Sequence, residues 1–128
     1  MKQIEINGKA FEIESNAFTF VRYKSIFKTG MMEDLQKIEM YLGKQHVYTK
    51  NLKEAGIPDE EIAGMVADQL RPDLDEFIIK ITQIAWILIY TANEKIEPYE
   101  DWLKNIKHFK IDDNWIAEVA ELAVNSFC

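Results

Sequence analysis

The chain has few of the features that cross-link small proteins or anchor them in membranes. Its 128 residues include one cysteine, Cys128. A single thiol cannot form an internal disulfide, which is typical of proteins from a reducing compartment. The N-terminus has no apolar signal-peptide run. The richest apolar segment, Leu74 to Ala92, contains Asp75, Glu76 and Lys80, and its charge-free part is shorter than the ~20 residues of a membrane-spanning helix. The sequence therefore predicts no membrane partner.

Positive charge is also in deficit. Lysine and arginine number 15 against 22 acidic residues, so the net charge is −7. A phosphate backbone is bound by positive surfaces, and this balance predicts no nucleic-acid partner. The stretch from Glu54 to Glu76 holds eight acids and one base, Arg71. It is either a solvated face or a docking face for a basic partner, and the sequence leaves both interpretations open.

Motifs of catalytic and metal sites are missing. The two histidines, His46 and His108, lie in different predicted segments without a cysteine or glutamate at ligand spacing. No glycine-rich phosphate loop and no nucleophile elbow occurs. We therefore predict no catalytic, cofactor-binding or metal-binding residues and no enzymatic activity, and the sequence does not assign a partner-binding face.

The first thirteen residues carry a hairpin pattern. Asn7-Gly8 is the preferred pair for a two-residue type I′ turn, because both central residues need a positive φ. Such a turn pairs Ile6 with Lys9 and Ile4 with Phe11, which places the apolar side chains on one face. The sequence predicts a hairpin over residues 3–13 as the only sheet.

Helical periodicity follows from residue 16 onward. Ser15 or Asn16 is a suitable cap for a first helix, which we expect to bury Val21 and to end at Gly30. A second helix begins near residue 31. Gly43 weakens its pattern, and whether residues 44–55 continue it without a kink stays open.

A third helix is predicted after Pro58, with Met65 on its apolar stripe. Asp73 and Glu76 have the spacing of a capping box that begins a fourth helix. Apolar residues from Leu74 to Ala92 lie nearly all round this helix, so we expect it to be the central and most buried element.

A short helix is predicted after Pro98, with Lys104, Lys107 and Lys110 at its end, and a last helix is capped by Asp112 or Asp113. Phe127 is expected on the apolar stripe of the last helix. The three tryptophans fit a core or its rim better than a ligand site: Trp86, Trp102 and Trp115. The predicted fold is mainly α, a single domain over residues 1–128 with a hairpin in 1–14, helices in 16–128 and a buried central helix.

Several segments together resemble a known protein family. They are the run from Phe18 to Phe27, Asp34-Leu35, Ile84-Ala85-Trp86, the run from Ile96 to Leu103, and Glu118-Val119-Ala120-Glu121-Leu122. Their apolar and aromatic spacing resembles the tail assembly chaperones of long-tailed phages and prophages of Gram-positive bacteria. The Ile-Asn-Gly-Lys hairpin is similar to many of them. Residues 40–72 match nothing in the family.

The resemblance implies a small cytoplasmic factor that acts during virion assembly and is absent from the mature virion. Family members hold the tape measure protein while tail tube subunits polymerise around it, and they have no catalytic residues. Many are made in two lengths by a ribosomal frameshift, and this chain would be the short form. Weak self-association is expected from apolar strips without another partner. The alternative is an acidic phage or prophage accessory regulator that binds another protein.

Overall fold

The computed structural model describes residues 2–110 and 113–125. In this part of the chain, two short strands precede six helices. The strands are β1 (Lys2–Ile6) and β2 (Lys9–Ile13), and the helices are α1 (Ala17–Phe27), α2 (Met31–Glu54), α3 (Asp59–Gln69), α4 (Arg71–Ala92), α5 (Tyr99–Lys104) and α6 (Asn114–Asn125). The predicted mainly α class with an N-terminal hairpin is confirmed.

The hairpin has the predicted register. Ile6 pairs with Lys9 and Ile4 with Phe11 in an antiparallel ladder. Asn7 and Gly8 both have a positive φ, of 53° and 82°, as a type I′ turn requires. The inner face buries Ile4 and other isoleucines against the helices, and the backbone amide of Glu14 then donates to the carbonyl of Leu88. The hairpin is thereby joined to α4.

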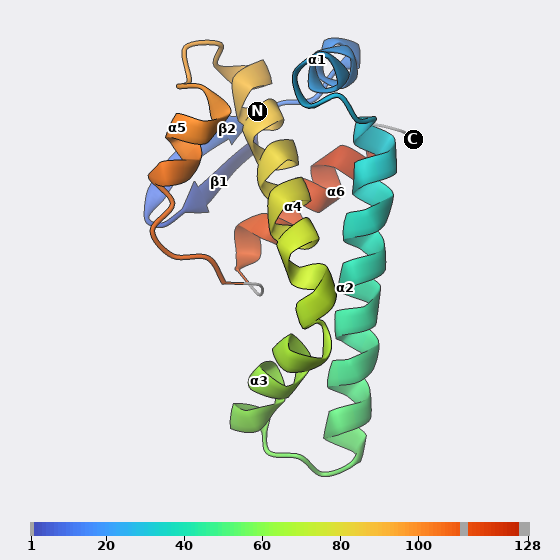
Figure 1. Ribbon diagram of the computed structural model, residues 1–128. Helices are drawn as coiled ribbons and strands as arrows, with labels where there is room; N and C mark the ends of the chain where they lie inside the picture. The colour runs from blue at the N-terminus through green and yellow to red at the C-terminus, as the bar shows by residue number, and fades with distance from the viewer. Residues whose placement is uncertain (1, 111–112, 126–128) are drawn as a thin grey trace.

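Helix α4 is the axis of the molecule. It runs through the centre in Figure 1 and contacts every other helix in the described chain as well as β2. Residues 84–89 are all buried. The expectation of a central, buried fourth helix is confirmed. Helix α2 lies beside it, and α3 closes the far end of this pair.

The predicted beginning of α4 is wrong. The helix starts at Arg71, with Pro72 in its first turn. Amide hydrogens of the first turn have no acceptor within the helix, so the hydrogen that proline lacks costs no hydrogen bond there. Asp73 and Glu76 do not form a capping box. They lie on the side of α4 that faces α2, and there they pair with Lys44 and Lys37.

Two other helix ends also differ from the sequence prediction, and one open question is answered. Helix α1 is capped by Asn16 as expected, but it ends through Lys28, which adopts the left-handed conformation, and Gly30 instead precedes α2. Helix α5 ends at Lys104, so Lys107 and Lys110 lie beyond it. Helix α2 is continuous through residues 44–54, which answers the question that Gly43 left open. Asp112 and Phe127 lie outside the described residues.

Two apolar residues do not occupy the expected buried stripes. Val21 is 68% exposed, because α1 instead turns Thr19 and Tyr23 toward the core. Met65 of α3 is 42% exposed, because α3 packs through Ile62 and its neighbours on one side only. Both helices lie at the edge of the molecule, where a single face is covered.

Candidate functional site

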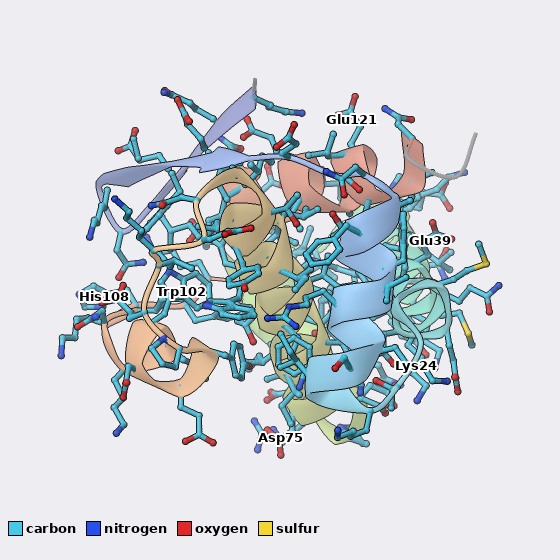
Figure 2. All side chains as sticks on the ribbon, turned by 90° about the horizontal axis from the view of Figure 1, so that it is seen from above. Lys24, Glu39, Asp75, Trp102, His108 and Glu121 are labelled. Carbon is cyan, nitrogen blue, oxygen red and sulfur yellow. The ribbon has the colours of Figure 1, made fainter. Side chains whose placement is uncertain are left out.

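The two histidines are placed as the sequence suggested. His46 is an exposed residue of α2, and His108 lies exposed in the segment after α5. Figure 2 shows the His108 side chain at the outer edge of the molecule. Its backbone exchanges hydrogen bonds of 2.8 and 2.9 Å with the side chain of Asn7, so the segment after α5 is fastened to the hairpin turn. Within residues 2–110 and 113–125, no three metal-ligating side chains gather.

The three tryptophans belong to the core. Trp86, Trp102 and Trp115 are all buried, and Figure 2 shows Trp102 directed inward from α5. The indole nitrogen of Trp86 donates to the carbonyl of Glu97 at 2.9 Å. Edge-on and tilted ring contacts then connect Phe27, Trp86, Tyr99 and Trp102 across α1, α4 and α5. Segments that carry the family resemblance therefore meet in one aromatic cluster, and that cluster is packing.

A buried carboxylate is the feature that sequence reasoning missed. Asp34 of α2 is fully buried, and its Oδ2 accepts hydrogen bonds from the hydroxyls of Tyr23, at 2.7 Å, and Thr29. Its Oδ1 lies 3.4 Å from the Nζ of Lys80 on α4. A signal for this pair does exist: Asp34 and Lys80 are opposite charges that each interrupt an apolar stripe of neighbouring helices.

The cluster around Asp34 joins three helices. Burial, followed by the hydrogen bond to Asp34, raises the pKa of the Tyr23 phenol well above its ordinary value, so the phenol stays a proton donor. The side-chain oxygen of Gln83 lies 3.1 Å from the same Tyr23 hydroxyl, as a second and more distant acceptor for its single proton. Because the partners come from α1, α2 and α4, the arrangement holds the helices together. Its carboxylate is occupied by these donors.

Six large apolar side chains on α1 and α2 face solvent, and Ile26 of α1 is the least exposed of them, at 37%. Phe18 and Val21 form one group, which we name the α1 patch; they are 53% and 68% exposed. Arg22 lies beside them, with its guanidinium 5.8 Å from the ring centre of Phe18 and within hydrogen-bond distance of the Tyr90 hydroxyl. This cation therefore stiffens the patch without covering it.

The second group lies along α2, and we name it the α2 stripe. It consists of Met32, Met40 and Val47, each 51% to 63% exposed. The core-facing residues of the same helix, such as Ile38, are fully buried, so the stripe occupies the opposite side. Exposed apolar side chains along a helix are a common feature of binding surfaces.

The acidic stretch divides into two parts. Three of its acids are paired with a base: Asp68 with Arg71, Asp73 with Lys44 and Glu76 with Lys37. The other five are exposed: Glu54, Asp59, Glu60 and Glu61 at the turn between α2 and α3, and Asp75 on α4. This end of the molecule is thus a negatively charged, solvated surface.

Comparison of the chain with family models, with curated proteins and with solved structures gave no match. Across the two described ranges, no helix is both long enough and apolar enough to cross a bilayer. The functional argument therefore rests on the exposed surfaces of this chain and on its family resemblance.

Proposed function

We propose that this chain is a tail assembly chaperone. It binds the tape measure protein without chemistry and keeps it soluble while tail tube subunits polymerise around it. It acts in the cytoplasm of the bacterial host and is absent from the mature virion. The observation that carries this proposal is the uncovered α1 patch, Phe18 and Val21, of a chain with net charge −7.

The surface chemistry supports such a role. A long amphipathic helix exposes an apolar face that must be covered to stay soluble, and helix-shaped partners dock through apolar anchors at helical spacing. Phe18 and Val21 are such anchors, because they lie three residues apart on one face of α1. The acidic surface keeps the complex soluble and acts mainly on the association rate. Binding should therefore survive moderate salt.

The resemblance supports the proposal at the level of the fold. Trp86 and Trp102, which belong to the resembling segments, are core residues in this chain. Core residues bear on the scaffold, whereas binding depends on what the scaffold exposes. The α1 patch lies within the resembling run 18–27 and is exposed, so it is the surface we assign to the tape measure protein.

Co-expression with the neighbouring tape measure gene tests the proposal. The parent chain should keep the long protein soluble and be recovered in a complex with it. A Phe18→Glu/Val21→Glu double variant should lower recovery by about tenfold, equivalent to ~1.4 kcal/mol of binding free energy. Ile79→Glu is the matched control, because Ile79 is an exposed apolar residue of α4 away from the patch. Thermal melts of both variants check that they fold.

Two outcomes would contradict the proposal. In the first, the tape measure protein stays insoluble and no complex is recovered. In the second, the chain captures a DNA-binding repressor, and the acidic accessory regulator then takes the place of the chaperone; the exposed acids Asp59, Glu60 and Glu61 are the surface that such a basic partner would meet. A slippery heptamer near the end of the reading frame, with an overlapping frame before a very long gene, would favour the chaperone.

A further inference from the structure

The α2 stripe is uncharged along its length. Helical geometry places Gln36 and Gly43 on the same side as Met32, Met40 and Val47, because residues three and four apart are neighbours on a helix. All five are exposed, and between residues 32 and 47 the charged residues lie at the flanks of this line. Helix α2 thus has a second apolar line, opposite the one that faces the core.

Gly43 has no explanation inside the chain. It lies in the middle of a continuous helix, where glycine costs about 1 kcal/mol relative to alanine. A Cβ at this position would meet nothing within 4 Å. The backbone there is helical, since the positive-φ glycines of the described chain are Gly8 and Gly56. A glycine on an exposed helix face does allow the backbone of another molecule to approach closely.

The charges beside the stripe separate along the helix. Toward its N-terminal end lie the exposed acids Glu33 and Glu39, and Figure 2 shows Glu39 at the outer edge of the molecule. Toward the C-terminal end lie the exposed bases Lys50 and Lys53, followed by the exposed acid Glu54 at the last position of the helix. Two further lysines of α2, Lys37 and Lys44, pair with acids of α4. A partner of one charge sign would match only half of this face.

We propose that the α2 stripe pairs antiparallel with the α2 stripe of a second copy of this chain, with the two Gly43 residues at the crossing point. This arrangement sets Met40 of each copy against Val47 of the other and brings Glu39 near Lys50 of the other copy. The interface is isologous, so one surface satisfies both partners. The proposal does not depend on the proposed function, because it needs this chain alone.

The dimer should be weak because its interface is small. Stable interfaces bury ~1,200 Å² or more in total, and a line of three large apolar side chains on one helix covers less. The dimer therefore dissociates on dilution. Sedimentation equilibrium over about a hundredfold range of concentration should show the mass rising from 15.0 kDa toward twice that value. A mass that stays at 15.0 kDa throughout would overturn the proposal.

Matched variants test the surface. Met40→Glu should weaken dimerisation by at least about tenfold, because it places like charges at the centre of a two-fold interface. Met65→Glu changes a similarly exposed methionine on α3 and should leave dimerisation unchanged. Glu39→Lys and Lys50→Glu should each weaken the dimer, and the double reversal should restore it. Equal dimerisation of Met40→Glu and the parent would overturn the proposal.

Cysteine cross-linking tests the direction of the pairing. In a chain whose Cys128 is replaced by Ser, Gly43→Cys should give a disulfide-linked dimer on mild oxidation, because the two residues meet at the crossing. Met32→Cys should not, because an antiparallel pair separates these positions. Efficient cross-linking through Met32→Cys would show a parallel pair and overturn the proposal. So would a chain that is monomeric alone and loses the tape measure protein in the Met40→Glu variant, since the stripe would then hold that protein.

Discussion

The two halves of α4 both carry isoleucines, but they differ in charge and in surroundings, because all five charged residues of the helix lie in its first half. From Ile84 to Ile89 every residue is buried, because the hairpin, α1, α5 and α6 gather around this half (Figure 1). The other half meets mainly α2 and α3 and leaves Ile79 47% exposed. An isoleucine in this helix is therefore buried or exposed according to how many elements surround its turn. The same contrast between a crowded end and an open end should appear in stability.

The largest expected effect comes from a charge placed in each half. Ile84→Asp should unfold the protein at ordinary temperature, because an unpaired carboxylate in an apolar core costs several kcal/mol out of the ~5–15 kcal/mol that stabilise a domain. Ile79→Asp makes the same change at the exposed position and should shift the melting temperature only slightly. Thermal melts followed by circular dichroism measure both. An Ile84→Asp melt within a few degrees of the parent would contradict the assignment of a buried half.

The second effect compares a buried ion pair with an exposed one on the same seam between α2 and α4. Lys80→Met should lower the free energy of unfolding by about 3 kcal/mol, because the buried Asp34 carboxylate loses its cation. Lys37→Met breaks the pair with Glu76, in which both side chains are about half exposed, and should leave the urea midpoint unchanged. Equal midpoints for the two variants would show that Asp34 does not depend on Lys80.

Removing one buried hydroxyl should lower the free energy of unfolding at Tyr23 but not at Tyr41. Tyr23→Phe takes a donor from the buried Asp34 carboxylate and should cost about 1.5–3 kcal/mol. Tyr41, which stacks on Phe77 in the open half, has a buried hydroxyl without a hydrogen-bond partner in the described chain. Tyr41→Phe should therefore be neutral or slightly stabilising. Urea denaturation at neutral pH separates the two, and a cost at Tyr41 equal to that at Tyr23 would contradict this account.

Three tyrosines should make the protein less stable at alkaline pH. Burial raises the pKa of Tyr23, Tyr41 and Tyr99 above the ordinary value of 10.0. Above pH 10 the unfolded chain releases phenolic protons that the folded chain retains, so the free energy of unfolding falls as the pH rises. The stabilisation is fully present below pH 10. Tyr23→Phe should lose stability less steeply above pH 10 than the parent, and parallel slopes would show that Tyr23 does not contribute.

The smallest expected effect is at Gly43, on the outer face of α2. At concentrations where the chain is monomeric, Gly43→Ala should raise the free energy of unfolding by about 0.5–1 kcal/mol. Alanine lowers the conformational entropy of the unfolded chain, and its Cβ has open space in the folded helix. Urea midpoints at low protein concentration provide the measurement. A loss of stability would mean that the glycine is needed within the monomer, which removes the reason for a close partner.

Local features of the sequence were sufficient for the hairpin and for the beginnings of α1, α2, α3 and α5. Asn7-Gly8 specifies its turn through backbone sterics alone, and Asn16 caps α1 through its own side chain, which accepts from the Thr19 amide. Prediction failed where two local signals competed, as at Asp73, whose capping pattern was outweighed by Pro72 and by Lys44 on the next helix. The surface that we assign to binding was not predictable, because Val21 has the same periodicity as a core residue.

The sequence by itself determined the class of the fold, the register of the hairpin and the apolar character of α4, because these depend on contacts within a few residues. Only the tertiary structure decided which apolar residues stay uncovered and which charges are buried. Asp34 of α2 becomes a buried residue because α1, the turn after it and α4 bring donors to it from three separate segments. Met40 and Val47 stay exposed because no element of the described chain covers that side of α2. Burial is a property of neighbours, and neighbours are chosen by the fold.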